Sequence, residues 1–317
     1  MDVASRIPIV VSQRWDIVHA FDHRPNVSVP WTVARALRKG RCLADWCDWW
    51  SRGGIITGRR RFRVLDSMEA WLEEGTKRSA EAVTVISSVL RERALSLGIP
   101  EERITLLPSG ADVESIQVED RAECRRELGL NQEGLTLGFI GFAVWDLRIL
   151  FEAFGRVLKD LPDVKLVWVG KDKDGVFPDF EREFALGDSL IRLGEVPYER
   201  ISKVLGAMDV HLLPLADNLA NRARWPNKLG DYLASGRPVV TMDVGDSGTF
   251  VNRHKVGIAS KPDTESFSKG ILSLAGDQVL RAQTGNTARV VAETVCPWDH
   301  SVQILEHLYH SILATAH

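Results

Sequence analysis

The sequence is poor in the features that mark secreted, metal-binding and membrane-spanning proteins. Only four of its 317 residues are cysteine (Cys42, Cys47, Cys124 and Cys296), and no two of them form a CxxC pair. With no histidines at zinc-finger spacing, we expect no metal site and four reduced, separately packed thiols. No apolar stretch reaches transmembrane length, and the first residues lack a basic-then-apolar signal pattern. These absences predict a cytoplasmic protein.

An excess of one charge and the common nucleotide motifs are also lacking. The formal net charge is −3, which gives no overall attraction to nucleic acid. The sequence contains neither GxxxxGK[ST] nor GxGxxG, so nucleotide hydrolysis and dinucleotide redox chemistry are poorly supported. The "GDSG" at Gly245–Gly248 matches a serine-protease nucleophile site only weakly, because the surrounding pattern has no place for that all-β architecture. We predict a loop there, with backbone N–H groups available to a ligand.

What the sequence has is a series of short apolar runs separated by amphipathic stretches. This alternation predicts α/β architecture with parallel sheets. With 44% apolar and 26% charged residues, the chain can bury two domain cores. The predicted strands lie at residues 16–21, 42–46, 82–87, 104–108, 135–141, 164–170, 190–194, 210–215 and 238–242.

A charged segment divides two βα series and predicts the domain organisation. We expect an amino-terminal domain at 1–112, a linker at 113–134 and a carboxyl-terminal domain at 135–296. Pro297 and Asp299 start a terminal helix at 297–317, which packs back towards the amino-terminal domain. Its apolar face carries Val302, Leu305, Leu308 and Ile312.

The most informative stretch is "RARWPNKLGDYLASGRPVV", from Arg222 to Val240. Pro226 and Asn227 predict a helix start, residues 228–235 the helix and Gly236 its left-handed cap. The helix therefore begins at the carboxyl ends of the strands, where open parallel sheets bind ligands. Arg222, Arg224 and Lys228 place positive charge at the amino end of this helix, where it opposes the helix dipole. A bound phosphate removes that conflict. A merely solvated helix start is the alternative, but it gives no reason to accept this conflict, so we favour a bound ligand.

"PNKLGDYLASGRPVV" resembles the nucleotide-sugar motif of glycosyltransferase family 4. Other stretches agree in the family's order, among them "DIVHAFDHRP", "AEAVTVISSVLRERALSLGIPEERITLLPSGAD" and "GEVPYERISKVLGAMDVHLLPL". The resemblance spans nearly the whole chain and implies the GT-B fold, with two facing Rossmann-like domains. It also implies retaining transfer of a sugar from a UDP- or GDP-sugar, without metal or cofactor, to a glycan or lipid-linked acceptor in cell-wall or polysaccharide biosynthesis.

The resemblance also implies a set of site residues. Asp231 would bind the ribose, while the loop holding Pro197 and Tyr198 would meet the base. Lys228 and the helix start would stabilise charge on the leaving diphosphate. The full set expected around the donor is Arg222, Arg224, Asn227, Lys228, Asp231, Pro197, Tyr198, Gly141, Phe142, Lys171, Gly245 and Ser247. Asp22 and His23 join Lys228 as candidate catalytic residues.

The sequence departs from the family pattern at three points. Ala223 stands where the family often has its first acidic residue, and the usual Arg and Lys after the first donor-domain strand are missing, with Arg148 displaced. Phe21 replaces the second histidine of a His-x-His, which leaves His19 as a core residue. We therefore keep a second hypothesis, a non-catalytic or partner-dependent nucleotide-sugar-binding chain. A GT-B epimerase fits the motif order less well.

The start of the chain departs as well. Family members have three further strands before "DIVHAF", where this sequence has only residues 1–14. Either the sequence is truncated or a partner completes the sheet. The strand at 16–21 would then have an open edge, which predicts self-association.

Two further stretches carry open alternatives. "ADWCDWW" at 44–50 places Asp45, Asp48 and Trp49 at a strand end, as an acceptor surface with Arg24 or as a packed loop. The basic "GRRRFR" at 58–63 is either a solvated loop or a site of peripheral contact with anionic lipid.

Overall fold

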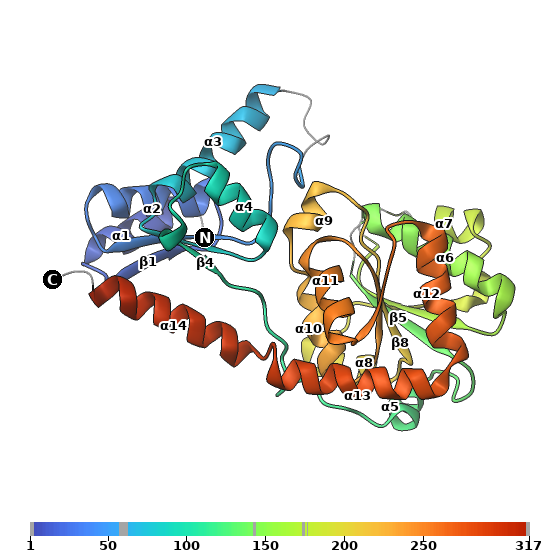
Figure 1. The fold of residues 1–317 in the computed structure, drawn as a ribbon. Coiled ribbons are helices and arrows are strands. Elements are labelled where there is room, and N and C mark those ends of the chain that lie inside the picture. Colours follow the sequence, from blue (N-terminus) through green and yellow to red (C-terminus); the bar gives the residue numbers. More distant parts are fainter. Residues whose placement is uncertain (1–2, 57–62, 142–143, 173–174, 176, 315–317) are drawn as a thin grey trace. The chain divides into compact units, whose positions relative to one another are not determined.

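The computed structural model describes residues 3–56, 63–141, 144–172, 175 and 177–314. The chain forms two compact units. Unit 1 comprises residues 1–109, 218–225 and 299–317, and unit 2 comprises residues 110–217 and 226–298. Each is an α/β unit built on a parallel sheet (Figure 1), as the sequence predicts.

Unit 1 holds a four-stranded sheet in the order β1-β2-β3-β4. Helix α1 packs on α2, α2 covers β1 and β2, and α4 lies on β3 and β4. The buried core contains Trp31, Trp46, Val83 and Leu90. The strands are β1 (Ile17–Ala20), β2 (Arg41–Trp46), β3 (Ala82–Val85) and β4 (Ile104–Leu106), and the helices are α1 (Val3–Ser12), α2 (Pro25–Ala36), α3 (Arg63–Ser79), α4 (Ser88–Ser96), η1 (Glu101–Arg103), α9 (Leu219–Ala223) and α14 (Trp298–Ala314), of which Trp298 itself falls in unit 2.

Unit 2 holds a six-stranded sheet in the order β10-β9-β8-β5-β6-β7. The order reverses at β5, and such a reversal is where doubly wound sheets open a crevice for ligands. Its strands are β5 (Thr136–Ile140), β6 (Lys165–Val169), β7 (Leu190–Gly194), β8 (Val210–Leu213), β9 (Val239–Met242) and β10 (Gly257–Ser260), and its helices are α5 (Arg121–Glu127), α6 (Val144–Asp160), α7 (Phe177–Glu183), η2 (Gly187–Ser189), η3 (Tyr198–Arg200), α8 (Ile201–Gly206), α10 (Asn227–Ala234), α11 (Gly245–His254), α12 (Thr264–Gly276) and α13 (Gln278–Thr294).

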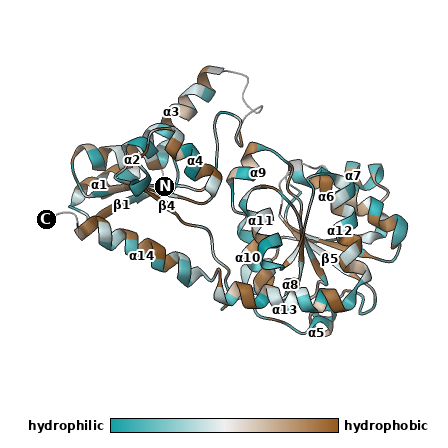
Figure 2. Ribbon diagram, viewed as in Figure 1, coloured by the Kyte–Doolittle hydropathy of each residue, from teal (hydrophilic) through white to brown (hydrophobic). Residues whose placement is uncertain are grey.

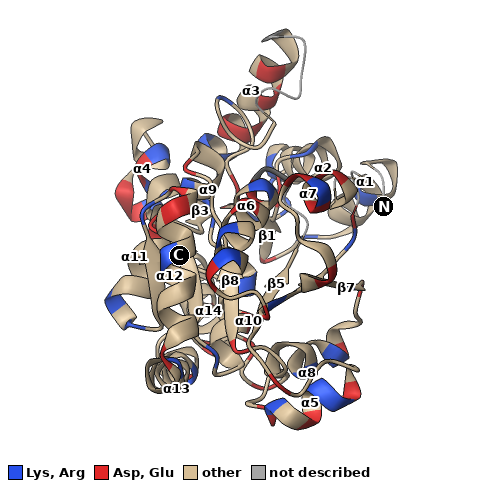
Figure 3. Cartoon of the chain, turned by 90° about the vertical axis from the view of Figure 1, so that its right-hand side faces the viewer, with Lys and Arg blue, Asp and Glu red and all other residues tan. Residues whose placement is uncertain are grey.

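The predicted linker at 113–134 is bound to unit 2 by a buried ion pair. It contains α5, whose Arg125 is fully buried and donates to Asp209 Oδ2 at 2.7 Å. Arg125 also donates to three backbone carbonyls, and Asp209 accepts from the backbone N–H of Thr136 at 2.8 Å. These contacts satisfy both charges, as burial requires. They fix α5 at the amino ends of β5 and β8. Figure 3 shows that α5 contains both basic and acidic residues.

The terminal helix forms as predicted, but its buried face is shifted. Val302 is exposed, whereas Leu305, Leu308 and Ile312 are half-buried together with Tyr309. Tyr309 takes part in a hydrogen bond with His19 Nδ1 at 2.9 Å, and Ser301 donates to the Pro108 carbonyl. Hydrophobic and hydrophilic turns alternate along α14 (Figure 2). The half-buried face of α14 therefore includes Tyr309, which was not predicted, and excludes Val302, which was.

His19 is a structural residue of unit 1, in line with its expected place in the strand. Burial, and then the charge of Lys77, lowers the pKa of His19 to about 4. The ring is therefore neutral near pH 7. The four cysteines are free thiols, and no described helix is long and apolar enough to cross a membrane.

Strand β1 is an edge of its sheet, and no strand among the described residues pairs with its free side. Unpaired strand edges recruit further strands. We therefore predict that the chain self-associates, with a mass in light scattering that rises above 35.4 kDa as its concentration increases. A single 35.4 kDa species at every concentration would contradict this expectation.

Candidate functional site

Two helices of unit 2 begin at the carboxyl edge of its sheet. Helix α10 follows the segment after β8, and α11 follows β9 directly. Neither Pro226 nor Val244, the residues that precede them, caps its helix with a side chain. The dipole and the backbone N–H groups at such helix amino ends attract anions. The predicted cap at Gly236 is confirmed by its φ of 69°.

Lys228 lies close to the turn that follows β5. Its Nζ is 4.9 Å from the centroid of the Phe139 ring, a cation–π distance. A Cβ at Gly141 would come within 2.5 Å of that Nζ, and Gly141 has a φ of 142°. Glycine is thus favoured here by the backbone conformation, because other residues rarely adopt this φ. The contact places an ammonium group beside the start of α10.

Two further polar residues of unit 2, Asp112 and Tyr198, form a cluster with Asp231. The Tyr198 hydroxyl donates to Asp112 Oδ2 at 2.9 Å. Burial, and then the charge of Asp112, raises the pKa of Asp231 to about 6, while Lys228 acts to lower it. For Asp112, partial burial is outweighed by hydrogen bonds from Ser115 and Tyr198, and its pKa is lowered. Two carboxylates and an exposed phenol thus lie next to the lysine.

A close backbone contact holds this cluster together. A Cβ on Gly230, in the second turn of α10, would lie 2.5 Å from the Gly110 carbonyl oxygen. The Ala111 N–H donates to the Cys296 carbonyl at 2.7 Å, which fixes the same segment from its other side. Asp112 is therefore carried to the first turns of α10, where Asp231 lies.

The other residues predicted around the donor have varied surroundings. Lys171 forms an ion pair with Glu195, and both side chains are exposed. Pro197 precedes η3, and Asn227 is an exposed first residue of α10. Phe142 lies outside the described residues.

The loop predicted at Gly245–Gly248 is wrong, because these residues form the first turn of α11. Gly245 has a φ of 60°, which lets the chain turn sharply into the helix. The buried Ser247 hydroxyl donates to the Val244 carbonyl at 3.2 Å. The Ser247 side chain is therefore used within the helix, and its backbone is the part left for a ligand.

Arg222 and Arg224 belong to unit 1, whereas Lys228 belongs to unit 2. Ala223, between the two arginines, is fully buried in the core of unit 1, and its carbonyl accepts the Ser87 hydroxyl. Burial raises the pKa of Asp48 to about 6, and the charge of Arg224 opposes this rise. The side chain of Arg224 thus acts on a carboxylate of its own unit.

The carboxyl end of β1 leads into a network around His23. The imidazole is buried, and its Nε2 lies 2.6 Å from Glu69 Oε1. Asp22 accepts from the His23 N–H and forms an ion pair with Arg24. Arg24 in turn lies over the Trp50 ring, 5.7 Å from its centroid. His23 is therefore an ordered interior residue, and Asp22 and Arg24 lie closer to solvent.

The loop after β2 is held by Glu73, a fully buried residue of α3. Its carboxylate accepts from Trp46 Nε1, from the backbone N–H groups of Trp50 and Ser51, and from the Ser51 hydroxyl, at 2.6–3.0 Å. Burial lowers the pKa of Lys77. The negative charges of Asp45 and Glu73 oppose this shift, because they favour the ammonium form.

Asp45 and Trp49, both predicted on the acceptor side, have interior contacts in this loop. Asp45 is buried and accepts the Thr84 hydroxyl, and burial raises its pKa. Trp49 packs on the core of unit 1, with the Arg93 guanidinium 5.2 Å from its ring centroid. These contacts correspond to the packed-loop interpretation of the segment.

Sequence reasoning missed Asp112, Glu73 and Lys77. Asp112 ends the quoted stretch "LLPSGAD", and its position after a predicted strand was a usable signal. Glu73 and Lys77 sit in "EAWLEEGTKRS", whose charges suggest a solvated helix. Nothing in that local pattern shows that Glu73, Glu74 and Lys77 are all buried.

Glu73 offers a test of the buried network. We predict that Glu73→Gln lowers the free energy of unfolding by about 2–4 kcal/mol, because an amide cannot accept all four hydrogen bonds. Denaturant unfolding followed by tryptophan fluorescence measures this change. The matched variant Glu92→Gln, at an exposed position of α4, should leave stability unchanged. Equal stabilities of the two variants would contradict the network.

Asp231 offers a test of the carboxylate cluster. Its pKa is raised from 3.8 to about 6, so the folded state disfavours the charged form. We predict that Asp231→Asn raises the free energy of unfolding by up to about 3 kcal/mol above pH 6. The gain should disappear below about pH 4, where the carboxyl is protonated in both states. Unfolding curves at pH 4, 6 and 8 measure this dependence, and a gain that is independent of pH would contradict it.

Comparisons with known proteins agree with this geometry. Residues 3–110 match the model described as "Glycosyl transferase 4-like domain", and residues 134–277 match "Glycosyl transferases group 1". The chain is 26% identical over 256 residues to "Putative teichuronic acid biosynthesis glycosyltransferase TuaH" of Bacillus subtilis, covering 78% of this chain and 62% of that protein. It is 25% identical over 237 residues to the D-inositol 3-phosphate glycosyltransferase of Nocardia farcinica, covering 69% and 50%.

Among solved structures, Anabaena HepE in complex with UDP superposes with a TM-score of 0.76 at 16% identity, covering 98% of this chain and 82% of that one. This likeness establishes the GT-B fold. The chain thus spans between half and two thirds of the length of the two curated relatives named above. Both family models and the fold lead to one conclusion: the chain belongs to the family 4-like glycosyltransferases of the GT-B fold.

Proposed function

We propose that this chain transfers a sugar from a nucleoside diphosphate sugar to a glycan or lipid-linked acceptor, with retention and without a metal. The observation that carries the proposal is the cluster of Lys228, Asp231 and Gly141 at the start of α10. The names of the relatives support it, since they are glycosyltransferases. HepE, of the same fold, has been solved with UDP, with UDP and glucose, and with UDP-glucose.

Each part of a nucleotide sugar has a counterpart in unit 2. The carboxylate of Asp231 can accept both hydroxyls of a ribose, and those donors would stabilise its charged form. The ring of Tyr198, 51% exposed, offers a surface for the base. Lys228 and the amino ends of α10 and α11 supply cationic and N–H donors to a diphosphate.

The same groups serve the chemical step. As the bond to the sugar breaks, negative charge grows on the leaving diphosphate and the sugar gains oxocarbenium character. Donors already held in place stabilise that charge without reorganisation. In the retaining mechanism that we propose, a diphosphate oxygen takes the acceptor proton, so no separate base is needed. The predicted phosphate contacts of Arg222 and Arg224 remain part of this proposal.

The acceptor would be recognised by unit 1. Asp22, Arg24 and Asp48 follow the carboxyl ends of β1 and β2, the edge at which parallel sheets bind ligands. With its pKa near 6, Asp48 can accept a hydrogen bond from a sugar hydroxyl at neutral pH. His23, held between Asp22 and Glu69, would position this loop. The biosynthetic role named for TuaH suggests a cell-surface polysaccharide.

Peripheral contact of a cytoplasmic protein with a membrane is a further part of the proposal. Helix α3 exposes Val64, Leu65, Met68 and Trp71, the last with 74% of its surface accessible. This face follows the basic stretch at 58–63 in the sequence. Apolar residues beside arginines are typical of segments that lie on anionic lipid surfaces.

Ala223 supports the alternative of a nucleotide-sugar-binding chain without transferase activity. It stands at the position of the family's first acidic residue, and it is fully buried in the core of unit 1. Under this alternative, the chain would bind the donor and require a partner for transfer.

The donor site can be tested by calorimetry with UDP and pyrophosphate. We predict that Lys228→Ala weakens binding of both about 10- to 100-fold, because a charge-assisted contact to phosphate is lost. Asp231→Asn should weaken binding of UDP but not of pyrophosphate, which has no ribose. Lys165→Ala, at the amino end of β6, is the matched control and should change neither. Unchanged affinities in the Lys228 variant would end its assigned role.

Transfer itself separates the two candidate functions. Purified chain would be incubated with UDP- and GDP-sugars, with and without cell extract as acceptor and with and without EDTA. A transferase should release nucleotide in both EDTA conditions, and the product should keep the anomeric configuration of the donor in NMR. Donor binding without any turnover in extract would favour the alternative.

A further inference from the structure

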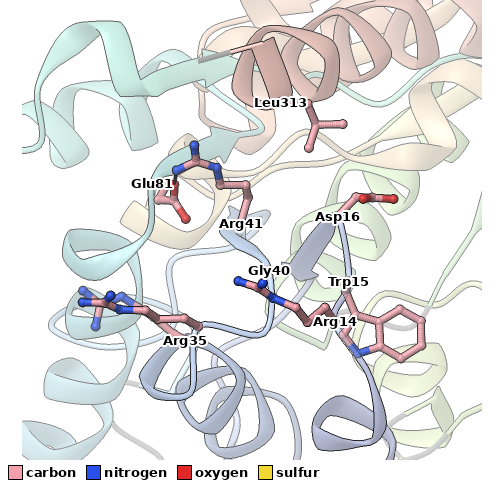
Figure 4. Close-up of a pocket in the computed structure, with 9 residues that line it drawn as sticks. Arg14, Trp15, Asp16, Arg35, Gly40, Arg41, Glu81 and Leu313 are labelled. Atoms are coloured by element: carbon pink, nitrogen blue, oxygen red, sulfur yellow. Dashed lines mark hydrogen bonds and ion pairs between the residues drawn. The ribbon is translucent and has the colours of Figure 1, made fainter. Parts of the chain in front are cut away.

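A pocket lies in unit 1, at the opposite edge of its sheet from Asp22 and Asp48. It has a volume of about 540 Å³ and is lined by Arg14, Trp15, Asp16, Arg35, Arg38, Gly40, Arg41, Glu81 and Leu313. Asp16, Arg41 and Glu81 stand at the amino ends of β1, β2 and β3. Figure 4 shows Arg14, Arg35 and Arg41 around one opening, with Glu81 beside Arg41. The pocket therefore belongs to neither of the sites proposed above.

The charges of the pocket do not balance internally. Four guanidinium groups face two carboxylates, those of Asp16 and Glu81. Glu81 is already used, because Arg41 Nη1 donates to its Oε2 at 2.7 Å and its Oε1 accepts from the Cys42 N–H. Among the described residues, Arg14, Arg35 and Arg38 form no hydrogen bond or ion pair through their guanidinium groups. An anion with several oxygens would give these forked donors their preferred partner.

The backbone around the pocket is fixed. The Trp15 N–H donates to the Lys39 carbonyl at 2.6 Å, and the Arg41 N–H donates to the Asp16 carbonyl at 3.1 Å. Gly40 lies so close that a Cβ there would be 2.5 Å from the Trp15 carbonyl oxygen. The segments that carry Arg14 and Arg41 are therefore locked together, so an anion would meet arginines on a rigid frame.

Arg38 adds an independent observation, because it occupies a strained conformation. It directly follows Leu37, the C-cap residue of α2, and has a φ of 50°. Glycine is the usual residue at this position after a helix, since it adopts the left-handed conformation without strain. An arginine there costs stability and brings a guanidinium group to the pocket. Strain kept at such a position is a recognised indication of function.

We propose that this pocket binds a phosphate-bearing ligand, either a soluble phosphate compound or the headgroup of an anionic lipid. Arg14, Arg35 and Arg38 would donate to the phosphate oxygens, and Arg41, held by Glu81, would add its charge. The half-buried Trp15 and Leu313 form the apolar part of the wall. This binding is separate from the donor site in unit 2, and it does not depend on transferase activity.

The test compares Arg35→Glu/Arg38→Glu with a matched control, Arg253→Glu/Lys261→Glu, which reverses two exposed charges of unit 2. Both variants change the net charge equally. Circular dichroism and thermal unfolding would establish that each is folded. Calorimetry with inorganic phosphate and pyrophosphate, in the presence of saturating UDP to occupy the proposed donor site, forms one arm. Co-sedimentation with vesicles of phosphatidylglycerol, against vesicles of phosphatidylcholine alone, forms the other.

We expect the pocket variant to bind at least about 10-fold more weakly than the wild type and the control in one arm, because two charge-assisted contacts become repulsive. A loss confined to the soluble phosphates identifies a free ligand, and a loss confined to the anionic vesicles identifies a lipid headgroup. The proposal is overturned if neither arm shows binding by the wild type, or if the two variants bind equally. If the pocket variant fails to fold, the milder Arg35→Gln/Arg38→Gln replaces it under the same criteria.

Discussion

The close packing of α10 against residues 110–112 is the constraint on which the donor site depends. Glycine at position 230 allows a backbone carbonyl to approach to within contact distance of the helix. That approach brings Asp112 and Asp231 near each other. Burial, and then the charge of Asp112, raises the pKa of Asp231 to about 6. Folding thus favours the charged form of Asp112, whose pKa is lowered, but disfavours the charged form of Asp231. Such an arrangement costs stability and is typical of binding sites.

The sheet of unit 1 separates two kinds of polar site. At its carboxyl edge, Glu73, Lys77 and His23 are buried, and their charges are matched by neighbouring groups. At its amino edge, Arg14, Arg35 and Arg38 are exposed and face few carboxylates. A network of the first kind shapes loops, whereas an unbalanced cluster of the second kind favours an ion from outside. One small sheet therefore supports a rigid loop on one side and a candidate anion pocket on the other.

Much of the fold could be predicted from the sequence, because buried parallel strands have clear apolar runs. The nine predicted strands agree with β1 to β9 to within a few residues at their ends. Strand β10, "GIAS", was not predicted, because it is a half-buried edge strand without such an apolar run. Helix α1, which contains Pro8, was not predicted either. The sequence predicts a loop at Gly245–Gly248 where the structure has the first turn of α11, since glycines and a serine suit a loop and a helix start equally.

The site was harder to predict, because its geometry comes from contacts between distant parts of the chain. The helix from Lys228 to Gly236 could be inferred from its caps and charges. The pairing of Tyr198 with Asp112 could not, since it depends on how residues 110–112 pack against α10. Ala223 differed from the family pattern in the sequence, but its burial in unit 1 became visible only in the fold.

The division of the chain has a consequence for how it could be dissected. The backbone passes between the two units at residues 109–110, 217–218, 225–226 and 298–299. Unit 1 is therefore built from three separate pieces of sequence, and unit 2 from two. A gene fragment ending near residue 110 would encode a sheet without α9 and α14, whose Ala223 and Tyr309 complete its interior. No single cut in the sequence therefore separates one complete unit from the other.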